Sequence, residues 1–260
     1  VKGARRTGKS TIVEEFAKNE FKSYILINFS KVSNKIKDIF ENDIMDLDLF
    51  FNKLSIMFSV ELFTRNTLFI FDEVQRFPRA REIIKFLVED GRYDYIETGS
   101  LISLKQNTED IVIPSEEEHI NMYPLDFEEF LWAMGDNVTI PFLKKCFDSL
   151  SPLGDAVHRK MMNLFRQYLL VGGMPQAVIE YVTSKNFAKV DHIKKTILTL
   201  YRQDITRFAK GYESKVLAIF DQIPAQLSKK EKKFFISSLG KNAKSRTYED
   251  AFMWLTEGMI

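Results

Sequence analysis

One short pattern near the start of the chain constrains the fold more than any other feature of the sequence. The pattern G-x-x-x-x-G-K-[ST] is matched at every fixed position by residues 3–10, Gly3-Ala4-Arg5-Arg6-Thr7-Gly8-Lys9-Ser10. Apolar residues then recur on one side of a predicted helix over Thr11–Lys18. Loops with this pattern join a strand to a helix, so we expect a strand-loop-helix unit here.

The residue types in this loop suit the binding of ATP with Mg²⁺. Backbone N–H groups can surround phosphates at the N-terminal end of the following helix. Lys9 is expected to reach the β and γ phosphates as a catalytic group, and Ser10 to bind Mg²⁺. The predicted nucleotide-binding residues of the loop are Gly3, Ala4, Arg5, Arg6, Thr7, Gly8, Lys9, Ser10 and Thr11. The alternative is a glycine-containing turn with a solvated lysine.

A second group of candidates lies at the end of an apolar run, Thr67-Leu68-Phe69-Ile70-Phe71-Asp72-Glu73. A continuous apolar run is typical of a parallel strand that is buried on both faces. Asp72 is expected to bind Mg²⁺ through water, and Glu73 to act as the general base on the attacking water. An acidic pair at a strand end is also an ordinary turn or helix cap, which is the alternative.

Hydroxyl side chains follow the next predicted strand, Tyr93–Thr98. Ser100 is predicted to sense the γ phosphate as a catalytic residue, with Thr98 as a second candidate, because ligands lie at the carboxyl ends of parallel strands. An ordinary polar turn fits equally well. Nearer the C-terminal end, helices are predicted over 187–208 and 214–223. In the first part of the chain, a further strand is predicted over Tyr24–Asn28, and helices over 31–41, 47–63 and 79–89. This alternation predicts an α/β fold with a parallel sheet.

Several separated motifs resemble one family of prokaryotic proteins. They occur in the family's order along nearly the whole chain: residues 3–11, Phe71-Asp72-Glu73-Val74-Gln75-Arg76-Phe77-Pro78, Thr98-Gly99-Ser100-Leu101, Tyr123–Phe130, Tyr168–Val178, Tyr201–Ile205 and Ile223–Ser228. With these motifs the chain resembles AAA-type ATPases in which an AAA domain is followed by the domain of unknown function DUF4143.

The resemblance implies a P-loop ATPase core of the AAA+ type over residues 1–125, a helical lid over 126–210 and part of a winged-helix segment over 211–260. It implies ATP and Mg²⁺ as ligands and slow, lid-coupled hydrolysis. The family has a further strand before the loop, which we expect to be missing, so that the chain is a fragment. The motif Gly172-Gly173-Met174-Pro175 resembles a lid element in which a proline packs near the nucleotide base, a role that passes to Pro175. A simple break between two helices is the alternative.

Arginines and charge clusters supply further candidates. Arg202 and Arg207 are candidates for neutralising transition-state charge from the lid, although a solvated face or a salt bridge with Asp204 is the stronger interpretation. Four arginines closer to the loop in sequence compete for that role: Arg5, Arg6, Arg76 and Arg79. The net charge of +1 hides an acidic stretch over 109–129 and a basic stretch over 229–246. The basic stretch, on a predicted helix-turn-helix over 229–239 and 248–256, suggests nucleic acid or a protein partner, or only a solvated face.

Composition excludes several other classes. A single cysteine, Cys146, excludes an internal disulfide and a cysteine-rich metal site, which favours a cytoplasmic protein. No apolar run is long enough to span a membrane. The 23 phenylalanines fall at core spacing rather than forming a base-stacking platform. The leading hypothesis is an Mg²⁺-dependent ATPase, the alternatives are a nucleotide-gated switch and a nucleic-acid-binding module, and the oligomeric state stays open.

Overall fold

The computed structural model describes residues 1–100, 117–229, 233–240 and 243–259. The chain forms two compact units. The first, which we call the α/β unit, contains Val1–Ala4, Gly8–Met122 and Ile205–Ile260. The second, the helical unit, contains Arg5–Thr7 and Tyr123–Asp204. Three residues of the predicted phosphate loop, Arg5–Thr7, therefore belong to the helical unit.

All strand pairs described in the α/β unit are parallel, as the sequence predicts. The strands are β1 (Lys2–Gly3), β2 (Ser23–Asn28), β3 (Thr67–Asp72), β4 (Asp94–Glu97), β5 (Gly99–Ser100) and β6 (Asn121–Met122). They pair in the orders β2-β3-β4 and β5-β1-β6. Only Thr98 separates β4 from β5, so the chain passes directly from one sheet into the other. The strand that bears Asp72 is therefore separated from the loop strand β1 by the β4–β5 segment.

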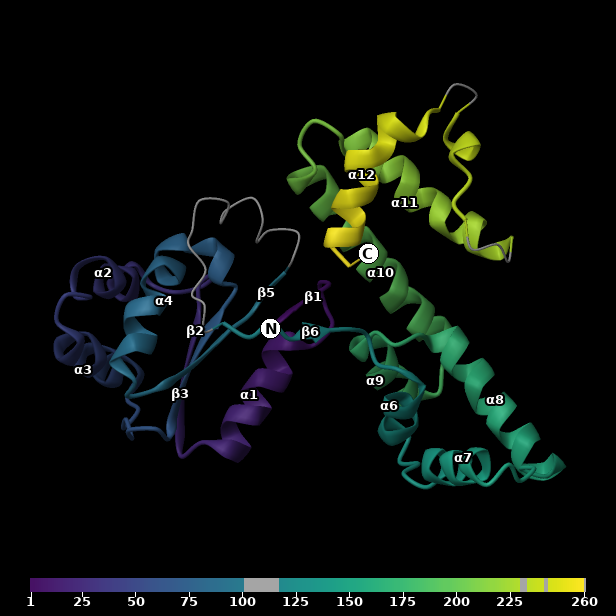
Figure 1. Ribbon diagram of the computed structural model, residues 1–260, viewed down its shortest axis with the longest axis horizontal. Helices are drawn as coiled ribbons and strands as arrows, with labels where there is room; N and C mark the ends of the chain where they lie inside the picture. The colour runs from purple at the N-terminus through teal and green to yellow at the C-terminus, as the bar shows by residue number, and fades with distance from the viewer. Residues whose placement is uncertain (101–116, 230–232, 241–242, 260) are drawn as a thin grey trace. The chain divides into compact units, whose positions relative to one another are not determined.

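Helices cover both faces of the sheet (Figure 1). Alternate residues of a strand point to opposite faces, and here both sets are apolar. One set, with Leu68 and Ile70, packs with Val13 and Ala17 of α1 (Lys9–Glu20). The other face is covered by three helices: α2 (Asn34–Asn42), α3 (Leu47–Phe58) and α4 (Pro78–Asp90). Burial on both faces explains why residues 68–71 of β3 are continuously apolar.

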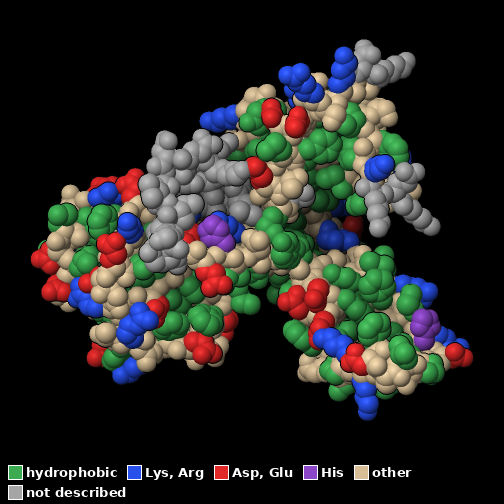
Figure 2. Space-filling view, viewed as in Figure 1, with side chains coloured by type: hydrophobic (Ala, Val, Ile, Leu, Met, Phe, Trp, Pro, Cys, Tyr) green, Lys and Arg blue, Asp and Glu red, His purple; other side chains and the backbone are tan. Residues whose placement is uncertain are grey.

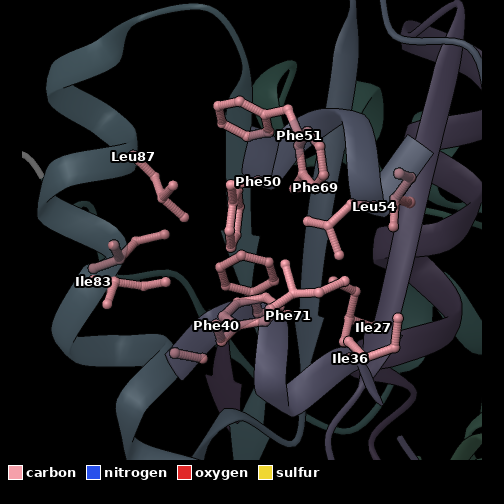
Figure 3. Packing of buried hydrophobic residues seen from close by; sticks show 14 of the residues in the cluster. Ile27, Ile36, Phe40, Phe50, Phe51, Leu54, Phe69, Phe71, Ile83 and Leu87 are labelled. Atoms are coloured by element: carbon pink, nitrogen blue, oxygen red, sulfur yellow. The ribbon is translucent and has the colours of Figure 1, made fainter. Parts of the chain in front are cut away.

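Aromatic rings fill the core between β2–β3 and these three helices. Phe40, Phe50, Phe69 and Phe71 are fully buried, and Phe51 is nearly so. Figure 3 shows them between the strands and the helices, with Ile83 and Leu87 of α4 facing them. Phe40 contacts both Phe50 and Phe71 edge-on, with ring centroids 5.2 and 5.6 Å apart. The expectation that phenylalanines form core rather than a stacking platform holds for this cluster.

The structure corrects the expectation that the strand before the loop is missing. Lys2 and Gly3 form β1, which pairs with Gly99–Ser100 on one side and with Asn121–Met122 on the other. Two residues are enough because parallel neighbours on both sides satisfy their backbone groups. The loop therefore leaves from a central strand.

The helical unit contains five helices among the residues described. They are α6 (Phe127–Ala133), α7 (Thr139–Asp148), α8 (Asp155–Val171), α9 (Pro175–Ser184) and α10 (Phe187–Phe208), of which α10 passes into the α/β unit after Asp204. Asp126 and Glu129 form a capping box at the start of α6. Phe130 and Leu131 of α6 are fully buried against α8 and α9.

Two of the family-like motifs pack against each other in this unit. The N–H of Leu125 donates to the carbonyl of Gly173 at 2.7 Å, and the hydroxyl of Tyr168 donates to the carbonyl of Leu125 at 2.9 Å. A Cβ on Gly173 would lie only 2.0 Å from that carbonyl oxygen, so the contact requires glycine. Pro175 begins α9 as its first residue, where its missing N–H costs nothing. The motif thus breaks and redirects the chain, as the alternative interpretation of it predicts.

The C-terminal segment differs from the predicted helix-turn-helix. It contains α11 (Glu213–Ser228), the 3-10 turn η2 (Ile236–Leu239) and α12 (Ser245–Glu257), and α11 continues through Pro224 where the sequence predicts an end. Residues 233–235 are not helical, because Gln226 of α11 accepts from the N–H of Phe235 at 3.1 Å and holds the chain there. The winged-helix prediction is not confirmed, since the described residues after Met122 include no strand.

Across the described helices, none combines the length and the low charge that crossing a membrane would need.

Candidate phosphate and metal site

The backbone of the predicted phosphate loop alternates in handedness. Arg6 and Gly8 have φ values of 70° and 92°, whereas Arg5 and Thr7 keep negative values. Such alternation turns successive N–H groups toward one side and forms a concave site for an anion. A left-handed conformation is uncommon for arginine, so the fold holds Arg6 there at a cost.

Lys9 folds back over the loop. Its ammonium group donates to the carbonyls of Gly3 and Ala4 at 3.1 and 2.7 Å, and the side chain is buried. Burial lowers the pKa of the Lys9 amine, and the carboxylates of Glu73 and Asp72 oppose that shift. A buried cation whose acceptors are neutral carbonyls is placed to bind a stronger, anionic acceptor.

Asp72 is the centre of a hydrogen-bonded cluster. Its Oδ1 atom accepts from the hydroxyl of Ser10 at 2.7 Å and from the hydroxyl of Thr98, and its Oδ2 atom accepts from the amide of Asn28 at 2.5 Å. The carboxylate and the hydroxyl of Thr98 are buried. Asp72 and Ser10, which the sequence predicts as metal ligands, are therefore brought together.

The register of the strands explains this convergence. Asn28 pairs with Asp72, and Phe71 pairs with Glu97, so Thr98 follows at the level of Asp72. Parallel strands end at one edge of the sheet, and each contributes its last polar residue to that edge. Asn28 is a site residue that the sequence prediction missed. The available signal was its place at the end of a predicted strand adjacent to the acidic one.

Glu73 leaves the strand end in a left-handed conformation, with φ 56° and ψ 41°. The side-chain amide of Gln75 donates to its Oε2 atom at 2.7 Å, and Gln75 is buried. The predicted general base is thus positioned by a neighbour two residues on, a second residue that the prediction missed. Strain at this position is typical of a functional residue.

The other predicted site residues have different surroundings. Ser100 pairs through its backbone with Gly3, and its side chain lies outside the described ones, so its role as a sensor stays a prediction. Thr98, the second candidate, contacts Asp72 directly. Thr7 is fully buried in the helical unit, whereas Thr11 is exposed on α1.

Three of the candidate arginines have described contacts. Arg5 forms an ion pair with Asp204 at 2.7 Å, and Arg79 forms one with Glu82 at 2.9 Å. The guanidinium of Arg207 lies over the ring of Phe208 at 5.2 Å. The salt bridge expected for Asp204 exists, but its partner is Arg5 rather than Arg202 or Arg207.

The described residues fit a magnesium ion better than a transition metal. No three His, Cys, Asp or Glu side chains among them cluster at metal-binding distance. The oxygen atoms of Ser10 and Asp72 are hard ligands of the kind that Mg²⁺ takes, in a site that leaves its other positions to water and phosphate.

Comparison with known proteins agrees with this geometry at the N-terminal end. A family described as AAA domain matches residues 1–131, and a family described as domain of unknown function DUF8612 matches residues 162–260. The resemblance to AAA proteins is thus confirmed, whereas the match at the C-terminal end is to DUF8612 and not to DUF4143. No curated protein and no solved structure matches the chain.

Proposed function

The chain belongs to the family of AAA domains, and we propose that it binds ATP with Mg²⁺ and hydrolyses the nucleotide slowly. The observation that carries the proposal is the cluster of Ser10, Asp72, Thr98 and Asn28 beside a loop of alternating handedness. A structural turn with a solvated lysine would need neither this buried carboxylate nor the burial of Lys9.

Each residue has a role that follows from its position. The N–H groups of residues 3–11 and the ammonium of Lys9 would bind the phosphates, and Ser10 and Asp72 would hold the metal ion. Mg²⁺ in that place would neutralise phosphate charge. Glu73 would accept the proton of the attacking water, with its carboxylate oriented by Gln75. Thr98, which donates to Asp72, would sense the γ phosphate through its hydroxyl. Ser100 is a second candidate for this role.

Binding is tested by titrating the intact chain with ATP and Mg²⁺ and measuring the dissociation constant. Lys9→Ala should abolish binding, because it removes the cation closest to the phosphates. Lys18→Ala is the matched control, since Lys18 lies on the same helix but pairs with Glu14 and Glu15 in solvent. Equal affinity of wild type and Lys9→Ala contradicts the proposal.

Turnover is tested with Glu73→Gln, which keeps the hydrogen-bonding shape and removes the base. Hydrolysis should fall by about 10²–10⁴-fold while ATP affinity is retained. We also propose that ATP binding changes the arrangement of the helices over 126–210, with Pro175 near the base. The alternative function is a nucleotide-gated switch, for which Glu73→Gln would lock the ATP-bound form and its partner binding in place.

A nucleic-acid-binding role is the second alternative. Lys and Arg side chains are visible on the α11–α12 segment, with acidic side chains beside them (Figure 2). Of the basic stretch, Lys229, Lys233, Lys244 and Arg246 are described, and residues 230, 232 and 241 lie outside the described part. Affinity for duplex or single strands that falls steeply with salt would support this role. We also propose a cytoplasmic location, which the composition supports because the sequence has a single cysteine.

A further inference from the structure

The middle of the phosphate loop is held at two points by one helix. The hydroxyl of Tyr201 donates to the backbone carbonyl of Arg5 at 2.8 Å. The carboxylate of Asp204 accepts from the guanidinium of Arg5 at 2.7 Å. Tyr201 and Asp204 are three residues apart in α10, so they lie on one face of that helix. The main chain and the side chain of Arg5 are therefore both hydrogen-bonded to α10.

The side chains of Tyr201 and Asp204 are both largely buried. Tyr201 is 8% exposed, and the side chain of Asp204 is 13% exposed. Burial, and the nearby carboxylate of Asp204, raise the pKa of Tyr201 to about 12, against the opposing effect of Arg5. The phenol is thus a proton donor at neutral pH. A buried hydroxyl needs an acceptor, and the Arg5 carbonyl is the acceptor that this fold provides.

Holding that carbonyl also sets the direction of the next N–H group. The peptide between Arg5 and Arg6 is trans and planar, so its C=O and its N–H point in opposite directions. When Tyr201 holds the oxygen on the α10 side, the N–H of Arg6 is directed away from α10. Arg6 is one of the two left-handed residues whose conformation shapes the anion site, and α10 restrains the peptide that precedes it.

We propose that Tyr201 and Asp204 are positioning residues of the phosphate site. They hold the Arg5–Arg6 peptide in its anion-binding conformation before the nucleotide arrives, and so reduce the cost of ordering the loop on binding. Both residues lie in the part of the chain that matches DUF8612, whereas Arg5 lies in the AAA match. This inference rests on the proposed function, ATP binding.

The test compares the ATP dissociation constants of Tyr201→Phe and Asp204→Asn with that of the intact wild-type chain. Each variant keeps the size of its side chain: Tyr201→Phe removes the hydrogen bond to the Arg5 carbonyl, and Asp204→Asn removes the negative charge that pairs with the Arg5 guanidinium. Loss of one hydrogen bond corresponds to about fivefold weaker binding, and affinity for inorganic triphosphate should fall equally, because the change acts on the loop. Tyr212→Phe is the matched control, since the described hydrogen bonds of Arg5 are made by Tyr201 and Asp204 and not by Tyr212.

A double-mutant cycle separates positioning from a general structural role. In an Arg5→Ala background, Asp204→Asn should have no further effect on the dissociation constant, because the contact is already absent. A persistent effect, or ATP binding by Tyr201→Phe at wild-type strength or tighter, refutes the inference. If those results appear while Lys9→Ala still abolishes binding, the proposed function stands and only the positioning role falls. If wild type fails to bind ATP, both fall.

Discussion

Replacement of Gly173 by alanine probes the contact between the two family-like motifs of the helical unit. Gly173 has no positive φ, so alanine is allowed there by the backbone itself. The obstacle is space, since the new Cβ would lie 2.0 Å from the carbonyl oxygen of Leu125 and 3.0 Å from the carbonyl carbon. An ordinary C···O contact needs about 3.3 Å, so the two backbones must separate by roughly 1.3 Å.

That displacement sets the magnitude of the effect. The hydrogen bond from the Leu125 N–H to the Gly173 carbonyl is 2.7 Å long, and such a shift breaks it, at a net cost of about 1 kcal/mol. Overpacking adds about 1–3 kcal/mol. We therefore expect Gly173→Ala to lower the free energy of unfolding of the helical unit by about 2–4 kcal/mol.

The assay is urea unfolding followed by tryptophan fluorescence. In a Trp254→Phe background, Trp132 on α6 is the remaining tryptophan and reports on the helical unit. Gly135→Ala in the same unit is the matched control, because Gly135 has a φ of 82° and free space around it. It should cost only the conformational penalty of about 1–2 kcal/mol. If Gly173→Ala costs no more than Gly135→Ala, the steric argument is wrong.

Two further predictions concern the α/β unit. Burial raises the pKa of Glu97 to about 7, so the native state binds this proton more tightly than the unfolded chain does. The contribution of this group to the free energy of unfolding is therefore fully present below the ordinary pKa near 4.5. It is lost as the pH rises through 7, which lowers the free energy of unfolding by up to about 3 kcal/mol. Glu97→Gln should flatten this dependence in urea titrations at a series of pH values, and an unchanged slope would refute the assignment. Phe40→Ala should lower the free energy of unfolding by about 3–5 kcal/mol, because the ring is fully buried among other aromatic rings. The half-exposed Phe16→Ala is its control, and equal losses would contradict the described core.

Patterns of neighbouring residues were sufficient to predict many of the helices and strands. The helix predicted over Phe187–Phe208 matches α10 at both ends, and the apolar run over 67–72 is β3. Both signals depend on periodicity and strand apolarity, which are properties of neighbouring residues. The helix that continues through Pro224 could not be predicted in this way, because the local rule ends a helix there.

The sequence predicted those residues of the candidate site that belong to short motifs. Lys9, Ser10, Asp72 and Glu73 follow from short patterns, and the structure brings Ser10 to Asp72. Asn28 and Gln75 were missed because their roles depend on strand register and on the conformation of a neighbour. The hydrogen bond from Tyr201 to Arg5 joins positions 196 residues apart, and a pattern of neighbouring residues cannot predict such a contact.

The assignment of Arg5–Thr7 to the helical unit bears on how the protein can be dissected. A segment cut at the family boundary, residues 1–131, keeps every residue of the loop pattern but loses α10. The backbone oxygen of Arg5 would then face water, and the loop would sample conformations that the intact chain excludes. Family boundaries mark shared ancestry of sequence, and in this protein they do not mark a place where the chain can be divided without changing its phosphate loop.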